Sequence, residues 1–152
     1  MRRHLRHVLL LTLLLVATIP VAADSILQGD IEGLELCPQW FCGLAVFVGG
    51  FDGSVNGLPR HGVFLAGINH DPDLPDEDGE FVFITGGVWT VRVPFRTVRG
   101  AVLGGILTSN GDNTFDVEMD LLIATPGGGV GATFAGTLRH DVFPPTIEGT
   151  IE

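Results

Sequence analysis

The stretch "FDGSVN", Phe51–Asn56, has a pattern that occurs at seven places in the chain. Each copy reads apolar, any residue, glycine, any residue, apolar, any residue. The other copies are "LQGDIE" from Leu27, "ITGGVW" from Ile84, "VRGAVL" from Val98, "VLGGIL" from Val102, "FAGTLR" from Phe134 and "IEGTIE" from Ile147. Positions one, three and five of an extended strand share a face. Each copy is therefore expected to place a glycine between two apolar side chains on the core side of a sheet.

A glycine on the core face of a strand removes side-chain packing and costs conformational entropy. Its recurrence indicates places where the sheet bends or admits a large neighbouring side chain, and glycine kinks are a means of curving sheets and closing barrels. The chain has ten Phe and two Trp residues with which to fill such notches by cross-strand packing. We therefore expect an antiparallel β-barrel, with a β-sandwich as the alternative.

The clearest single strand is "TFDVEMDLLIAT", Thr114–Thr125, in which apolar residues alternate with Asp116, Glu118 and Asp120. This period of two is typical of a half-buried strand. Similar or continuous apolar runs cover residues 26–36, 44–51, 62–68, 80–85, 88–93, 98–107, 132–140 and 146–151. No window predicts a helix, and turn clusters such as "SNGDNT" and "TPGGGV" separate the runs. The fold class is all-β, with about eight or nine short strands of undetermined order.

Residues 1–23 have the features of a secretory signal peptide: a basic start, a Leu-rich stretch and a small residue, Ala23, at the expected cleavage site. The apolar run from Val8 to Ile19 is shorter than the roughly 20 residues of a membrane anchor. Cleavage after Ala23 would leave a single domain at 24–152. The expected location is secreted, periplasmic or otherwise extracytoplasmic.

The charge of residues 24–152 is strongly negative, with five Arg, no Lys and eighteen Asp and Glu, a formal charge of −13. Such a surface repels nucleic acid and anionic lipid. Outer-membrane barrels carry aromatic girdles and an outward apolar band, whereas Tyr is absent here and the strand at 114–125 alternates with acids. We expect neither nucleic-acid binding nor membrane insertion of the mature domain.

Cys37 and Cys42, in "LCPQWFCG", are the only cysteines. An even pair in an exported chain predicts a disulfide. Redox dithiols use a two-residue spacer at the start of a helix, whereas four residues intervene here. A structural bridge that closes a short loop is therefore the preferred interpretation.

The segment "NHDPDLPDEDGE", Asn69–Glu80, is rich in carboxylates. Ca²⁺ prefers several oxygen ligands, which makes Asp71, Asp73, Asp76, Asp78 and Glu80 candidate ligands. The segment lacks EF-hand spacing, and a solvated acidic loop is the preferred interpretation. No other cofactor is expected.

Three histidines follow residue 23: His61, His70 and His140. Their spacing does not predict a zinc site. His70 and the His140–Asp141 pair each follow a strand and begin a turn, so they would form a polar rim if the two turns met. No serine lies in a hydrolase elbow, and no catalytic residue is assigned.

The segments "FVFITGG" and "VRGAVLGG", within residues 81–105, resemble the glycine-rich hairpins of dirigent and allene-oxide-cyclase-like barrels. The resemblance implies a barrel with an interior cavity for a small molecule. It carries no functional residue over to this chain.

The expected function is that of a non-enzymatic binding module for a small apolar ligand or a partner surface. A cavity enzyme of the isomerase or cyclase type and a purely structural envelope protein are the alternatives. A Phe-lined cavity of about 300 Å³ or more would favour ligand binding or catalysis, and a filled interior would favour the structural role. The oligomeric state is left open.

Overall fold

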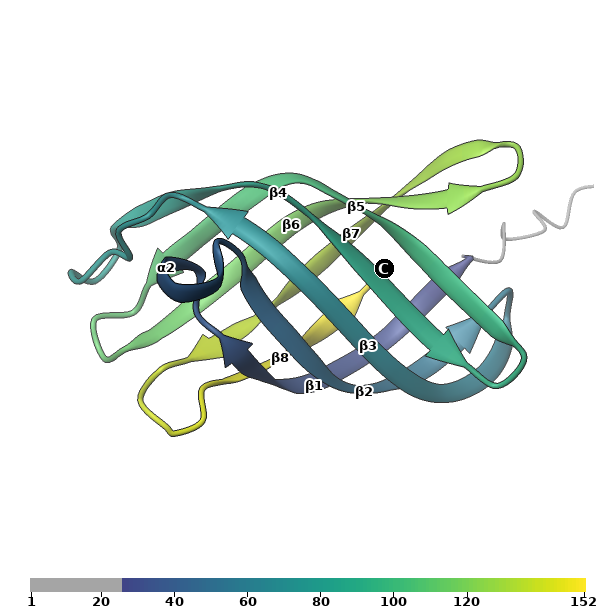
Figure 1. Cartoon of the computed structure of the whole chain (residues 1–152), viewed down its shortest axis with the longest axis horizontal. Helices are drawn as coiled ribbons and strands as arrows, with labels where there is room; N and C mark the ends of the chain where they lie inside the picture. Colours follow the sequence, from purple (N-terminus) through teal and green to yellow (C-terminus); the bar gives the residue numbers. More distant parts are fainter. Residues whose placement is uncertain (1–25) are drawn as a thin grey trace, which may run out of the picture.

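The computed structural model describes residues 26–152, which form a closed barrel of eight antiparallel strands (Figure 1). Each strand pairs with its neighbours in the chain, and β8 returns to pair with β1. The elements are β1 (Leu27–Cys37), α2 (Gln39–Cys42), β2 (Ala45–Val55), β3 (Leu58–His70), β4 (Phe81–Val93), β5 (Arg96–Ser109), β6 (Thr114–Thr125), β7 (Gly128–Arg139) and β8 (Thr146–Ile151). The predicted all-β barrel is confirmed.

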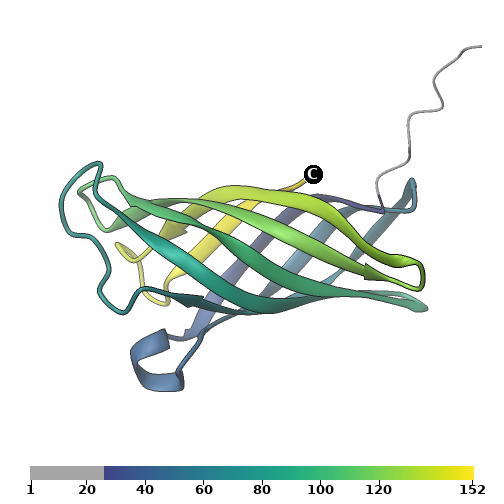
Figure 2. The ribbon, with the colours of Figure 1, turned by 90° about the horizontal axis from the view of Figure 1, so that it is seen from above.

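The two ends of the barrel differ in the length of their connections (Figure 2). At one end, the turn end, strands are joined by two-residue turns at 56–57, 94–95 and 126–127. Asn56 and Gly57 both have positive φ there, at 51° and 72°, as a twisted hairpin turn requires. At the other end, the loop end, the connections are longer and comprise residues 38–44, 71–80, 110–113 and 140–145.

The nine runs expected from the sequence became eight strands because two of them, 80–85 and 88–93, are parts of β4. The break between them is a shift of the register with β3 that lies between Ile84 and Gly86. A second shift in β5 lies between Val102 and Gly104. These shifts change the phase of the strands. In the copies that begin at Ile84 and Val102, the first residue is buried as expected, but the expected core placement of the fifth residues, Val88 and Ile106, is wrong.

The other five copies of the pattern place their first and fifth residues in the core, as expected. Four of their glycines form two pairs across neighbouring strands, a third glycine pair lies outside the pattern, and an inward aromatic ring covers each pair. The pairs are Gly29 with Gly53 under Phe51, Gly33 with Gly49 under Phe64, and Gly136 with Gly149 under Phe134. A Cβ added at Gly149 would lie 2.5 Å from Cζ of Phe134. Phe rings thus fill the glycine notches, as predicted.

The disulfide between Cys37 and Cys42 is present, with Cα atoms 6.1 Å apart. Between the cysteines the chain forms the four-residue helix α2, contrary to the expectation that no segment is helical. The short loop tightened by Pro38 makes one helical turn because the backbone N–H groups of Phe41 and Cys42 both donate to the carbonyl of Pro38.

Within residues 26–152 no helix is long and apolar enough to cross a membrane. The predicted signal peptide and its cleavage site lie outside the described residues.

Candidate functional site

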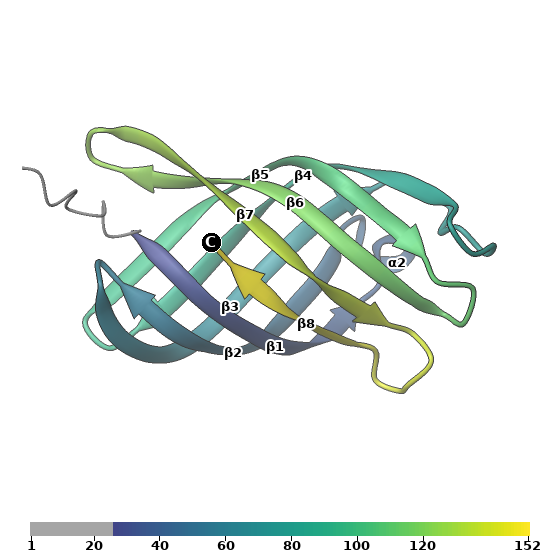
Figure 3. The same cartoon turned by 180° about the vertical axis from the view of Figure 1, so that it is seen from behind.

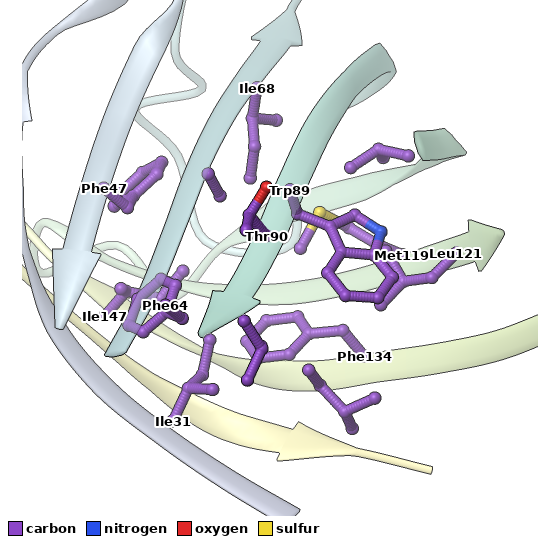
Figure 4. A pocket seen from close by; sticks show the side chains of 14 residues that line it. Ile31, Phe47, Phe64, Ile68, Trp89, Thr90, Met119, Leu121, Phe134 and Ile147 are labelled. Atoms are coloured by element: carbon purple, nitrogen blue, oxygen red, sulfur yellow. The ribbon is translucent and has the colours of Figure 1, made fainter. Parts of the chain in front are cut away.

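The interior of the barrel is filled by side chains (Figure 4). The space between Phe47, Phe64, Trp89, Met119 and Phe134 has a volume of about 30 Å³, and apart from Thr90 its lining residues are apolar. A second space, toward the loop end, has a volume of about 20 Å³. Each is one or two water molecules in size. The interior cavity implied by the resemblance to dirigent-type barrels is therefore not present in these spaces.

A polar pair lies at the loop end of the barrel. Nε2 of His140 is 2.8 Å from Oε2 of Glu35, whose side chain is only 5% exposed, while that of His140 is 24% exposed. The imidazole ring also packs edge-on against Phe115, with ring centroids 5.6 Å apart. The backbone N–H of His140 donates to Asn113, and that of Glu35 donates to Pro145. The pair thus joins β1 to the loops at 110–113 and 140–145.

His70 lies at the same end and borders the same 20 Å³ space as His140 and Glu35. Its backbone is held by Gln39 of α2, because the amide Nε2 donates to the His70 carbonyl at 2.7 Å and Oε1 accepts from the His70 N–H at 2.8 Å. The side chain of Gln39 therefore continues the hydrogen bonding of β3 and ties α2 to the barrel. The structure does bring His70 and His140 to one rim.

Asp141 does not join that rim. Arg139 donates to it twice, from Nε at 3.1 Å and from Nη2 at 2.8 Å. The hydrogen bond from Arg139 lowers the pKa of Asp141, and the same hydrogen bond raises the pKa of Arg139. Asp141 belongs to an ion pair on the surface, and Glu35 is the carboxylate that His140 contacts.

A carboxylate–imidazole pair can transfer protons only if a substrate reaches it. The space beside Glu35 and His140 holds about one water molecule, and every buried polar side-chain atom in the described part of the chain already has a hydrogen-bond partner. The geometry favours a structural role, in which the pair fastens the loop end.

The acidic loop, residues 71–80, joins β3 to β4 at the loop end. Its ends are fastened: Oδ2 of Asp71 accepts from the N–H of Phe83 at 3.2 Å, and the N–H of Gly79 donates to Ser109. Asp73, Asp76, Glu77, Asp78 and Glu80 are exposed. No three His, Cys, Asp or Glu side chains among residues 26–152 are arranged to hold a metal ion.

The outer wall of the barrel is divided by charge. Outward carboxylates lie on β1, β2, β6 and β8, and we call this set the acidic face: Asp30, Glu32, Asp52, Asp116, Glu118, Asp120 and Glu148. It includes the three acids of the strand that the sequence identified most clearly, which are on the solvated side as expected. Figure 3 shows β7, β8 and β1 at the front of this side.

The wall formed by β3, β4 and β5, which lies between β2 and β6, contains no Asp or Glu. Six large apolar side chains point outward from it and are between 51% and 62% exposed. We call this set the apolar face: Val63, Leu65, Phe81, Phe83, Val88 and Leu103. Figure 1 shows the strands β3 and β4 of this wall at the front of the barrel. Exposed apolar patches of this kind on one wall mark interaction surfaces.

Two features of the site escaped the sequence reasoning although signals for both were present. Glu35 continues the inward series of β1 from Leu27 through Ile31, so its period predicted an inward carboxylate. The absence of Asp and Glu between Arg60 and Asn69, and again from Phe81 to Ser109, indicated a wall without acids.

Comparisons with protein-family models, with curated proteins and with solved structures found no match to this chain.

Proposed function

We propose that this protein is an exported, non-enzymatic binding module that engages a partner surface through the outer wall of its barrel. The observation that carries the proposal is the apolar face on β3, β4 and β5. Six half-exposed apolar side chains without a carboxylate among them are costly to leave in water, since each buried side chain of this size stabilises an interface by about 1 to 2 kcal/mol.

The filled interior supports an outer-wall function over a binding site for a small apolar ligand inside the barrel. Ligand pockets have volumes of roughly 300 to 1,000 Å³, about ten to thirty times the volume of the 30 Å³ space among the inward aromatic rings. The same comparison disfavours an enzyme that acts within the barrel.

A purely structural envelope protein is the second candidate, and the filled interior favours it too. The two functions differ in the state of the apolar face. In a binding module, the apolar face contacts one defined partner. In a purely structural protein, the apolar face has no specific partner.

The test is site-specific photo-crosslinking in the producing cell. A photoreactive amino acid replaces Val88 in the centre of the apolar face, and a matched control replaces Thr133, an exposed outward residue of β7. A discrete crosslinked product formed from position 88 and not from position 133 supports the proposal. No product from position 88, or equal products from both positions, overturns it.

A further inference from the structure

We infer that the partner of the apolar face is a second copy of this chain, bound face to face with its strands antiparallel to those of the first copy. This inference rests on the proposed outer-wall function. It names the partner and the orientation from the distribution of charge around the apolar face.

Opposite charges lie at the two ends of that face. At the turn end, Arg92, Arg96 and Arg99 of β4 and β5 are exposed, and none of the ion pairs within residues 26–152 involves them. At the loop end, the acidic loop between β3 and β4 exposes five carboxylates that likewise take part in no ion pair among those residues. The long axis of the apolar face therefore runs from positive to negative.

A two-fold axis that lies in the plane of the contact, at right angles to the long axis of the apolar face, makes the pattern self-complementary. Because a two-fold interface uses the same patch on both copies, rotation by half a turn places the arginines of each copy beside the acidic loop of the other. A parallel arrangement would put like charges together, which disfavours it. The charge pattern thus selects the antiparallel orientation.

The net charge of the chain is negative, but the β3–β5 wall itself contains no carboxylate. Asp30, Glu32 and Glu148 of the acidic face lie on β1 and β8, away from the contact, whereas the acids of β6 and Asp52 of β2 border it. Exposed charges separated by more than roughly 10 Å are largely screened at physiological salt. Two copies of this acidic chain therefore repel each other least when they associate through the β3–β5 wall.

The size of the wall fits a modest but specific interface. A strand of 13 residues, the length of β3 and β4, is about 43 Å long at about 3.3 Å per residue, and three strands at about 4.8 Å spacing are about 14 Å wide. The strip is roughly 600 Å² per copy, or about 1,200 Å² in total, at the lower end of the range for stable interfaces. A weak, concentration-dependent dimer is expected.

The first measurement is sedimentation equilibrium of the purified protein, expressed from its full sequence, over a range of concentrations. Wild type should reach twice the monomer mass. Val88→Glu places two negative charges at the centre of the contact, one from each copy. It should raise the dimer dissociation constant at least about a hundredfold. The matched control Thr133→Glu should leave that constant unchanged. Circular dichroism melting curves establish that both variants remain folded.

The second measurement tests the orientation by charge reversal. Arg92→Glu with Arg99→Glu should weaken the dimer about tenfold, and so should Asp76→Arg with Glu77→Arg, because each set creates like charges at both ends of the interface. The four substitutions together restore opposite charges and should restore dimerisation. Failure of the combined variant to regain affinity overturns the antiparallel arrangement.

A monomer at all concentrations overturns the dimer, as does a dimer that Thr133→Glu dissociates and Val88→Glu does not. If the protein is monomeric while position 88 still crosslinks to a different macromolecule in the cell, only the identity of the partner is wrong and the proposed function stands. A crosslinked product with twice the mass of the chain supports both.

Discussion

The packing of Phe134 against the glycine pair Gly136 and Gly149 predicts a large effect of adding one methyl group. In Gly136→Ala, the new Cβ would lie 2.6 Å from Cζ of Phe134 and 2.8 Å from Cα of Gly149, and still closer to the carbonyl oxygen of Glu148. Normal carbon–carbon contacts are about 3.5 to 4.0 Å. The ring and the backbone of β8 must therefore both move by about 1 Å.

The loss of stability caused by Gly136→Ala depends on whether the neighbouring groups can move to relieve the close contacts. Phe134 is among the most completely buried side chains, so its ring cannot turn outward, and the backbone of β8 is held by pairing with β1 and β7. Overpacking a core by one or a few methyl groups costs about 1 to 3 kcal/mol. We expect Gly136→Ala to lower the free energy of unfolding by about 2 kcal/mol and Gly136→Val by at least as much. Gly53→Val, which meets Phe51 at 2.9 Å, should behave in the same way.

The assay is urea unfolding followed by circular dichroism, with Gly131→Ala as the matched control. Gly131 lies on the same strand, but a Cβ there has no heavy atom within 4 Å. That variant should be neutral or stabilised by up to about 1 kcal/mol, because alanine loses less backbone entropy than glycine on folding. Phe134→Leu in the Gly136→Ala background should recover part of the loss. If Gly136→Ala and Gly131→Ala unfold with equal free energies, ring-over-glycine packing does not determine the stability of this barrel.

Three further predictions concern the loop end. The intact mass of the protein should be about 2 Da below the fully reduced value because bridging removes two thiol hydrogens, and alkylation of two free thiols without reductant would contradict the disulfide. Calcium and NaCl at matched ionic strength should shift the melting temperature equally if the acidic loop is only solvated; a calcium-specific rise abolished by Asp76→Asn with Asp78→Asn would instead make the loop a binding site. The hydrogen bond from Arg139 lowers the pKa of Asp141, so the stabilisation it supplies is present above the unfolded-state pKa of about 3.9 and is lost as the pH falls through the lowered pKa. The difference in melting temperature between wild type and Asp141→Asn should accordingly shrink in acid, and a difference that grows there would contradict this sign.

The fold class could be predicted from sequence because the relevant signals are local. Alternation with a period of two, as in Phe115 to Ile123, is a property of an extended backbone with one side in water, and the recurring glycines marked positions where aromatic rings lie over the sheet. The bridge between Cys37 and Cys42 could also be predicted, because a loop this short brings the two residues together whatever the rest of the chain does.

Long-range packing decided the rest. In β4 the register with β3 shifts between Ile84 and Gly86, and this phase change places Val88 outside rather than in the core. The contact of Glu35 with His140 joins residues 105 positions apart, so no local pattern could pair them. Asp141 forms an ion pair with Arg139 and does not join the two histidines. The volume left inside depends on how every inward ring fits its neighbours across the barrel. The sequence by itself determined which residues form strands and which side of most strands is apolar, whereas closure of the sheet determined which walls those residues share, because a face of a barrel is a set of residues brought together only by strand pairing.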